Sequence, residues 1–303
     1  MTGSLMKTGW QKFTAFIAPY LYVAPALIFF ALFLAYPVYF ALRLSFYNWN
    51  GLTSIDSMQY VGLANYRELL TDRLFWLSLK NTILFAIVTT IAQMGLSFLL
   101  AFALWYFRLP LNKTFRAAIF FPGVVSMMIL GLTWREILSS EGLVNGLLSA
   151  LTGTDVTIQW LGNPKLVLWT IIAIDTWIFT GTNMILWLAG MLAIPSDLID
   201  AAKIDGANVR QLVSRVVVPL LKQVTSLSLL LNIIGGFQAF AIVYVTSRGG
   251  PAHLSEVLAT YVFWNAFYSA GPQRFGYAST IAAIMVMILL VFSLVRIRMS
   301  RIL

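Results

Sequence analysis

The sequence has few of the residues that stabilise a secreted or metal-dependent soluble protein. Its 303 residues include no cysteine and one histidine, so no disulfide framework and no thiolate metal site can form. Charged residues make up 10% of the chain, against about 25% in soluble domains. The single histidine, His253, has no cluster of metal-ligating residues near it in the sequence. We therefore expect a chain that mostly does not face water, and we expect no metal site.

The sequence also lacks the motifs of a self-sufficient enzyme. It has no Gly-x-x-x-x-Gly-Lys-Ser/Thr phosphate loop, so any ATP-driven activity needs another polypeptide. Serine and histidine occur without a triad-like setting, and we expect no catalytic residues and no cofactor bound by this chain. The alternative is a membrane enzyme built around Asp175. It predicts clustered titratable groups inside apolar segments, where Asp175 stands alone.

Long apolar stretches are the dominant feature of the sequence. Hydrophobic residues make up 60% of the chain and the mean hydropathy is +0.84. Since a helix needs about 20 mostly apolar residues to cross a bilayer, we expect a single membrane domain with spans at 18–42, 81–106, 117–135, 166–192, 221–246 and 275–296. A further uncharged stretch, Val257–Gln273, has 17 residues. We interpret it as an interfacial or partly re-entrant helix, with a seventh span as the alternative.

The basic residues give these spans an orientation. With six spans, one side of the membrane holds both termini and the loops 108–116 and 197–222. That side carries 12 of the 20 Lys and Arg residues and a net charge of +9, while the other side has a net charge of +1. An excess of Lys and Arg marks the cytoplasmic face, so we expect both termini there. Topology thus accounts for the basic balance, and we do not expect nucleic-acid binding.

The connection at 197–218 differs from the other loops. Ser196 or Asp197 is a suitable N-cap for a short helix over 197–204, and Gly206 then supplies a break or a left-handed turn. Asn208 can cap a second helix that runs to about Val218, before Pro219 interrupts the pattern. Two short helices joined at a glycine predict a knob that projects from the membrane. Such a shape suits a groove on a cytoplasmic partner.

A motif within this connection identifies a family. Asp200-Ala201-Ala202 is followed by Asp205-Gly206-Ala207, with Pro219 twelve residues after Ala207. This pattern resembles the EAA loop of permease subunits of binding-protein-dependent ABC importers. The usual form begins Glu-Ala-Ala, so this chain has Asp200 in place of the glutamate. It also has Val213 where the sugar-type branch commonly has phenylalanine.

Further stretches, in their order and spacing, resemble the carbohydrate branch of that family, the relatives of maltose and glycerol-3-phosphate permeases. The resemblance covers roughly residues 20–297. The stretches are Tyr36-Pro37-Val38, Leu44-Ser45-Phe46, Asn48-Trp49, Val61-Gly62-Leu63, Asn65-Tyr66, Asn81-Thr82, Phe120-Phe121-Pro122, Trp134, Gly142-Leu143, Phe237-Gln238 and Gly249-Gly250-Pro251.

The resemblance implies an all-α integral membrane fold of six helices with a coupling loop, as in type I ABC importers. It implies a multi-pass protein of a bacterial-type plasma (inner) membrane that imports a sugar or sugar derivative by alternating access. A non-sugar solute and, further off, a secondary transporter are the alternatives. The implied partners are a second permease, forming a heterodimer, two ATPase subunits that hold ATP and Mg, an extracytoplasmic solute-binding protein and membrane lipid.

Two sets of candidate residues follow. The resemblance implies ATPase coupling through the 197–218 loop, and specifically through Asp200, Ala201, Ala202, Ile204, Asp205, Gly206, Ala207 and Arg210. Polar or aromatic groups inside spans are candidates for substrate contact, since polar groups in lipid are costly. These are Asp175, Asn183, Asn232, Phe237 and Gln238.

The second set has alternative roles. Asp175 faces a pore, pairs with a partner subunit, or bonds to Thr176, Thr180 or the backbone. For the amides, hydrogen bonding between helices competes with substrate contact. Aromatic rings that could stack on a sugar are more often packing groups, and Gly235-Gly236 is either a hinge or a site of close helix packing. The rings are Trp177, Trp187, Phe237 and Phe240.

Overall fold

The computed structural model describes residues 9–107, 112–268 and 272–302. Within these residues the chain is helical except for connections and one small hairpin, in which strand β1 (Tyr47–Asn48) pairs antiparallel with β2 (Gln59–Tyr60). The helices in chain order are α1 (Gly9–Phe30), η1 (Ala31–Ala35), α2 (Tyr36–Leu44), η2 (Ile55–Ser57), α3 (Ala64–Thr71), α4 (Arg73–Tyr106), α5 (Asn112–Phe120), η3 (Phe121–Val124), α6 (Met127–Ile137), α7 (Leu143–Thr152), α8 (Val167–Leu192), α9 (Ser196–Ile204), α10 (Val209–Leu212), η4 (Val213–Val217), α11 (Val218–Leu220), α12 (Lys222–Phe237), α13 (Phe240–Thr246), α14 (Leu258–Phe267) and α15 (Phe275–Ile302).

Four of these helical segments are long and apolar enough to cross a membrane: Tyr20–Leu44, Arg73–Tyr106, Val167–Leu192 and Phe275–Arg298. Two bent helix pairs raise the number to as many as six if each pair forms one span. The long segments overlap the first, second, fourth and sixth predicted spans. The first bent pair, Lys113–Val124 with Met127–Ile137, covers the third predicted span. The second, Val209–Leu220 with Lys222–Phe237, overlaps the fifth only over Lys222–Phe237.

The third predicted span, 117–135, is wrong as a single helix. The chain turns by 97° between Lys113–Val124 and Met127–Ile137. Pro122 precedes the turn, in η3, and its ring cannot continue a regular helix. Tight packing fixes the first half in place, because a Cβ added at Gly181 of α8 would overlap the carbonyl oxygen of Ile119. A window of apolar residues cannot show such a bend.

The fifth predicted span, 221–246, is also two helices. Helix α12 ends at Phe237, and α13 begins at Phe240 after a break at Gln238-Ala239. At its other end α12 makes an angle of 73° with Val209–Leu220. Gly236 packs directly on the backbone of Ala86 in α4. Of the two roles that the sequence allows for Gly235-Gly236, a hinge or close helix packing, this contact is the second. The helix breaks two residues after the glycine pair.

Helix α4 is longer than the sequence predicts, and α14 is too short for the alternative of a seventh span. Helix α4 begins at Arg73 rather than at residue 81, because the Asp72 carboxylate accepts hydrogen bonds from the backbone N–H groups of Leu74 and Phe75, at 2.9 and 3.3 Å. With 34 residues, α4 is about 51 Å long, well beyond the apolar layer of about 30 Å. Helix α14, within the uncharged stretch 257–273, has only 10 residues and is too short to span.

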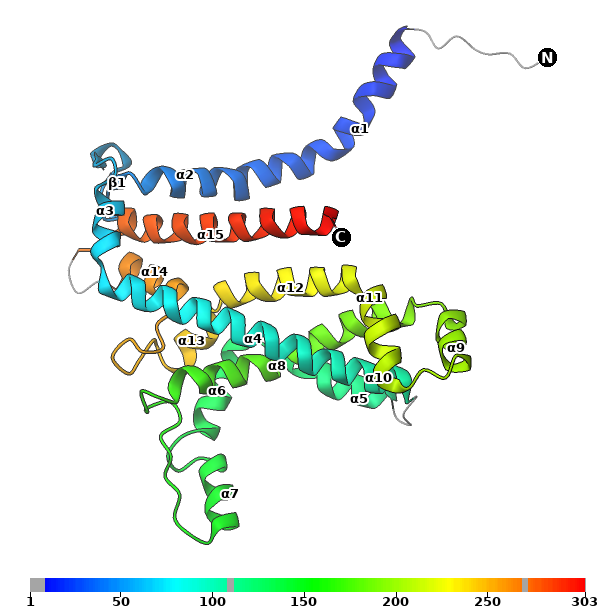
Figure 1. Cartoon of the computed structure of the whole chain (residues 1–303). Coiled ribbons are helices and arrows are strands. Elements are labelled where there is room, and N and C mark those ends of the chain that lie inside the picture. The colour runs from blue at the N-terminus through cyan, green and yellow to red at the C-terminus, as the bar shows by residue number, and fades with distance from the viewer. Residues whose placement is uncertain (1–8, 108–111, 269–271, 303) are drawn as a thin grey trace.

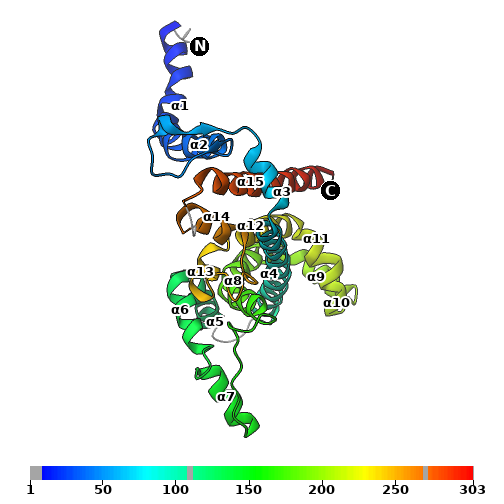
Figure 2. The same cartoon turned by 90° about the vertical axis from the view of Figure 1, so that its left-hand side faces the viewer.

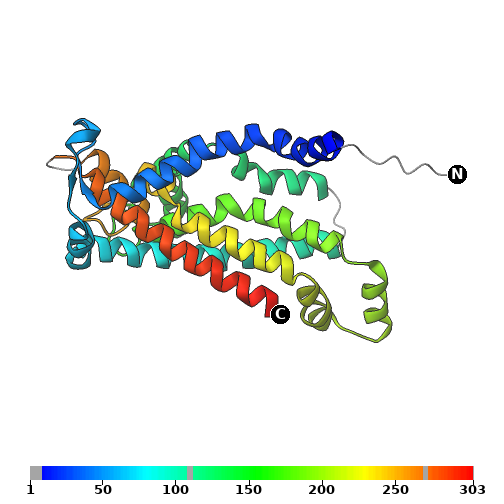
Figure 3. The same cartoon turned by 90° about the horizontal axis from the view of Figure 1, so that it is seen from above.

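The helices run roughly along one direction, and the bundle has two distinct ends (Figures 1 and 3). The C-terminus and α9 lie at one end, here called the α9 end. The hairpin, α3 and α14 lie at the other, here called the α14 end. Helix α7 extends away from the bundle (Figure 2). Buried side chains form three clusters, which centre on α8 with α13, on α8 with α9 to α11, and on α14 with α15.

Candidate functional site

A cavity of about 560 Å³ lies in the middle of the bundle between α4, α6, α8, α12 and α13. Its polar lining includes four of the five residues predicted to contact substrate. Phe237, the fifth, is buried and does not line the cavity. The lining residues are Thr89, Gln93, Met127, Asp175, Phe179, Thr182, Asn183, Leu186, Leu231, Asn232, Gly235, Gly236, Gln238, Ala239 and Ala241.

Asp175 is held at the cavity wall by a residue that the sequence reasoning missed. The side-chain amide of Gln93 in α4 donates to the Asp175 carboxylate at 2.9 Å and to the Asp175 backbone carbonyl at 3.3 Å. Asp175 is 6% exposed, so this bond fixes its direction. Thr180 instead donates to the carbonyl of Thr176 at 2.6 Å. Gln93 is the only amide side chain in the apolar run from Thr82 to Phe107. This feature of the sequence could have identified Gln93 as a candidate for the site.

Asn183 and Asn232 form a reciprocal amide pair between α8 and α12. Each side-chain nitrogen donates to the other's oxygen, at 3.0 and 2.9 Å. Ser228 donates to the Asn183 oxygen at 3.2 Å, and Asn232 donates to the Ser228 carbonyl at 2.7 Å. The predicted hydrogen bonding between helices is therefore present, at residues that also line the cavity. The pair joins the two helices that flank the 197–218 connection.

Gln238 lies at the break between α12 and α13, where its side chain is exposed. Its amide makes no hydrogen bond to any described residue, so it is available to a solute in the cavity. Together the wall offers one carboxylate and several amides, groups that both donate to and accept from hydroxyls. The described cavity therefore suits a neutral, hydroxyl-rich solute.

The aromatic side chains singled out from the sequence lie elsewhere. Trp187 is buried and does not line the cavity, and its ring meets Phe98 edge-on. Trp177 packs edge-on against Trp134, and Phe240 stacks on Tyr244. The aromatic ring in the cavity wall is Phe179, one turn after Asp175 on α8. The four aromatic side chains that the sequence suggested for stacking on a sugar therefore pack against other parts of the chain instead.

The 197–218 connection forms the predicted knob of two short helices. Helix α9 ends in a glycine turn: Gly206 has φ of +78°, its N–H donates to the Lys203 carbonyl at 3.0 Å, and the Ala207 N–H donates to the Ala202 carbonyl at 2.9 Å. This is a Schellman cap. Asn208 then caps α10 in a reciprocal pair of 2.9 Å bonds with Gln211.

Two details of the knob correct the sequence prediction. The N-cap of α9 is Pro195 without a side-chain bond, rather than Ser196 or Asp197. The second helix does not stop before Pro219 but continues through it to Leu220. A π-helical turn, Val213–Val217, precedes the proline, and such a turn changes the register of hydrogen bonds where a proline removes a donor. The chain changes direction at Leu221 instead.

The knob has one buried face and one exposed face. Ile199 is buried against Met191 and Leu188 of α8, in a cluster that Ala202 adjoins. Ile204, at the tip, is 86% exposed. The other residues predicted for coupling are exposed except for Ala202 and Ala207, which are half-buried; the exposed ones are Asp200, Ala201, Asp205, Gly206 and Arg210. The knob is therefore anchored to α8 and has an apolar, exposed tip.

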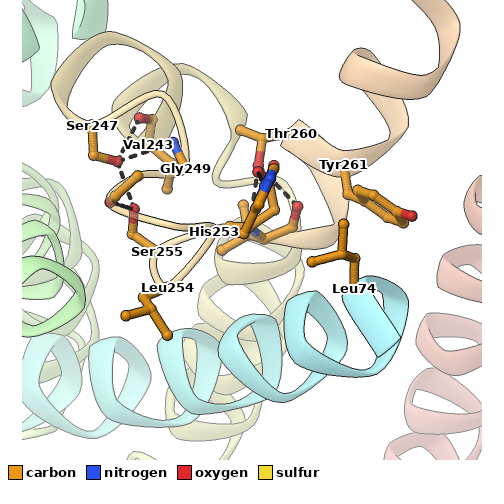
Figure 4. A network of polar contacts seen from close by, with 12 residues as sticks. Leu74, Val243, Ser247, Gly249, His253, Leu254, Ser255, Thr260 and Tyr261 are labelled. Carbon is orange, nitrogen blue, oxygen red and sulfur yellow. Dashed lines mark hydrogen bonds and ion pairs between the residues drawn. The ribbon is translucent and has the colours of Figure 1, made fainter. Parts of the chain in front are cut away.

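At the opposite end, the loop between α13 and α14 is held by a dense network (Figure 4). Glu256 is 0% exposed and bonds to His253 at 3.0 Å. Asn81 of α4 donates to the carbonyls of Leu254 and Glu256, at 3.1 and 2.9 Å. Ser255 donates to the Gly250 carbonyl at 2.6 Å. This loop fixes α13, and with it the cavity wall, against α4.

Burial and hydrogen bonding set the pKa of two carboxyls at this end. Burial raises the pKa of Glu256, and its bonds to Thr260 and His253 offset only part of that rise. Burial also acts to raise the pKa of Asp72, but hydrogen bonds from Tyr261 and Tyr277 and from the α4 backbone outweigh it, so the pKa falls. Asp72 is thus ionised and ties α4 to α14 and α15, through Tyr261 at 2.5 Å and through Tyr277.

The chain is similar to known transport proteins over nearly its whole length. It is 31% identical to "Probable ABC transporter permease protein YurN" of Bacillus subtilis, covering 93% of this chain and 95% of the relative. It is 33% identical to "Trehalose/maltose transport system permease protein MalF" of Thermococcus litoralis, covering 93% of each. A chain of a bacterial ABC transporter involved in alginate import has the same fold, with a TM-score of 0.83 and 21% identity, over 96% of this chain and 98% of that one.

The family model for binding-protein-dependent transport system inner membrane components matches residues 10–303. That match includes the residues of the cavity and of the knob. The family supplies the membrane part of a transport system rather than an enzyme. This chain belongs to the binding-protein-dependent transport system inner membrane components.

Proposed function

We propose that the chain is a permease subunit of an ATP-driven importer that moves a saccharide into the cytoplasm by alternating access. The observation that carries this proposal is the knob, which is built from the chain's own caps yet leaves Ile204 86% exposed. An apolar side chain at the tip of a rigid projection suits a groove on a separate ATPase subunit, which holds ATP and Mg. A second permease and a binding protein complete the assembly.

The α9 end is the cytoplasmic side in this proposal. It carries Lys203, Arg210 and Arg215 of the knob, and Arg296 and Arg298 lie near the end of α15. The excess of Lys and Arg on this side follows the positive-inside rule. Both termini are then cytoplasmic, and the α14 end, with its long connections, meets the binding protein.

Coupling follows from the way the knob is connected. Helix α8 enters it and α12 leaves it, and these two helices carry Asn183 and Asn232 at the cavity wall. The contact of Ile199 with the α8 cluster makes the knob and the end of α8 move together. A displacement of the knob therefore changes the angle between α8 and α12, and with it the Asn183–Asn232 pair. Opening this pair would change access to the cavity.

The substrate class follows from the cavity wall and from relatives. One carboxylate and the amides of Gln93, Asn183, Asn232 and Gln238 suit the hydroxyl groups of a saccharide. The relative from Thermococcus litoralis is named for trehalose and maltose, and the similar solved chain belongs to an importer of alginate. A neutral saccharide is the substrate we infer.

The substitution Gly206→Pro tests the coupling role. Proline requires φ near −65°, whereas Gly206 has φ of +78° and donates its N–H to Lys203. The variant should insert normally but hydrolyse ATP without uptake, so the ratio of solute imported to ATP hydrolysed should fall by about tenfold or more, as for loss of an interface contact worth 1.4 kcal/mol. Membrane vesicles containing the whole transporter give both rates.

Gly153→Pro is the matched control. Gly153 ends α7 with φ of +68°, its N–H bonds to Ser149 at 2.9 Å, and its surroundings are open. The same chemical change thus breaks a similar turn outside the knob, and the coupling ratio should stay unchanged. A normal ratio in the Gly206 variant, or an equal fall in both, would refute the coupling role of the knob.

A further inference from the structure

A second cavity, of about 700 Å³, lies at the α9 end, apart from the central one. It is enclosed by the last turn of α4, by α5, by the end of α8 and by α9. Its lining combines aromatic and aliphatic side chains with two cations and one carboxylate. The residues are Leu104, Trp105, Tyr106, Arg116, Leu192, Ile194, Ser196, Ile199, Asp200 and Lys203.

Arg116 of α5 is the first sign that this cavity takes an anion. Its Nε atom is hidden from solvent and has no hydrogen-bond partner among the described residues. A buried donor on a charged group is costly when left without an acceptor. The side chain also makes no ion pair with any described carboxylate. An anionic oxygen in the cavity would satisfy it.

Lys203 of α9 provides a second cation in the same lining. Its one described carboxylate partner is Asp200, with Nζ and Oδ1 3.5 Å apart. Both side chains are more than half exposed, and such pairs contribute little. Lys203 therefore remains able to bind an anion together with Arg116, and the Ser196 hydroxyl is a further donor.

The apolar part of the lining favours a lipid as the source of that anion. Trp105 and Tyr106 end a membrane-crossing helix, where aromatic rings gather at the level of lipid headgroups. Leu192 is exposed beside them at the end of α8. Cations next to a Trp–Tyr rim and aliphatic side chains match a headgroup phosphate with its glycerol and first methylenes. A free phosphate would need only the cations.

We propose that this cavity binds the phosphate of an anionic membrane-lipid headgroup through Arg116 and Lys203. The lipid joins α5 to α9 and so ties the knob to the bundle. Each basic residue near an anionic leaflet contributes enough to change binding by about fivefold. Lipid binding requires only that the chain lies in a membrane, so this inference does not depend on which solute is transported.

Native mass spectrometry of the full-length chain, titrated with phosphatidylglycerol, tests the inference. Arg116→Gln and Lys203→Gln should each weaken retention of the lipid by about fivefold. Arg215→Gln is the matched control, because it removes one positive charge from the same end of the bundle, outside the cavity lining. Phosphatidylcholine, which has no net charge, should be retained weakly and equally by all forms.

Separate outcomes identify other occupants and would overturn the proposal. If the Arg215→Gln variant loses the lipid as readily as the other two variants, the lipid is attracted to the positive charge of this end in general and not to the cavity. Inorganic phosphate that displaces the lipid, with the same dependence on Arg116 and Lys203, would make free phosphate the ligand. Loss of the lipid when the ATPase subunits are added would assign the cavity to an acidic side chain of that partner. Because Lys203 is exposed, the Lys203→Gln variant should fold, and it tests the proposal even if the Arg116→Gln variant misfolds.

Discussion

Two connections between helices, at opposite ends of the molecule, differ in how they are stabilised. The knob between α8 and α12 makes its turn with its own backbone bonds and capping residues, and its tip is exposed. The loop between α13 and α14 is held by side chains from α4, and Glu256 within it is completely buried. One connection makes its turn locally and leaves its tip exposed. The other is complete only because the rest of the chain surrounds it.

The difference bears on where, in the proposed function, the chain contacts another protein. Three residues other than glycine in or next to the α13–α14 loop have positive φ: Arg248, Ala252 and His253. Each such residue costs roughly 1–3 kcal/mol, and the network around it must hold it in place. The knob has its one left-handed turn at Gly206, where glycine carries no such cost. The loop is therefore a fixed support, whereas the knob is a surface prepared for contact.

Ile204→Asp should give the largest effect and tests the knob half of the comparison. Because Ile204 is exposed, the change should alter the stability of the isolated chain by less than about 0.5 kcal/mol. A charge at the centre of an apolar contact should nevertheless lower uptake by about thirtyfold or more. Uptake into vesicles and thermal unfolding give the two numbers, with Ile204→Leu as the conservative control. Unimpaired uptake by the Asp variant would show that the tip has no partner.

Asn81→Ala tests the loop half of the comparison. It leaves the carbonyls of Leu254 and Glu256 without their donor, which should lower stability by about 2–3 kcal/mol. Asn208→Ala removes the cap of α10 in the knob and should cost about 1 kcal/mol. Thermal unfolding followed by tryptophan fluorescence compares the two. Equal losses of stability in the two variants would mean that the α13–α14 loop does not depend on contacts with α4 more than the knob depends on its own cap.

Glu256→Gln gives the smallest effect, as a dependence on pH. The folded-state pKa of Glu256 is raised by burial, so its contribution is fully present below the ordinary carboxyl pKa and is lost as pH rises through the raised value. Glutamine does not titrate, and the stability of the variant relative to the parent should therefore increase with pH over that window. The slope is at most about 1.4 kcal/mol per pH unit for one proton. If the difference in stability between variant and parent does not change with pH, the pKa of Glu256 is the same in the folded and the unfolded chain, and the expected dependence is refuted.

The sequence predicted those parts of the fold that depend on local composition. The apolar runs located α8 and α15 closely, and the pattern around Gly206 and Asn208 predicted both turns of the knob. The bends at Val125-Ser126 and Gln238-Ala239 were missed. They depend on contacts between helices, such as Gly181 against Ile119, that lie far apart in the sequence.

The candidate site was predictable residue by residue but not as an arrangement. A carboxylate or amide inside an apolar span marks a polar interior, which identified Asp175, Asn183, Asn232 and Gln238. The Gln93–Asp175 bond connects residues 82 positions apart, and one sequence gives no information on which helices touch. Phe237 is buried and does not line the cavity, and the sequence does not show the break after α12 that lies next to this ring.

The first helix bears on how the chain is made. None of the membrane-crossing part of Tyr20–Leu44 is buried, and the three core clusters include no described residue before Leu69. Its attachment is at its end, where Ser45 accepts hydrogen bonds from Asn65 and Thr280, at 2.9 and 3.1 Å. Of these three residues, Thr280 is synthesised last. The bond from Thr280 can therefore form only after the start of α15 has been made, so the attachment of the first helix is completed late in synthesis.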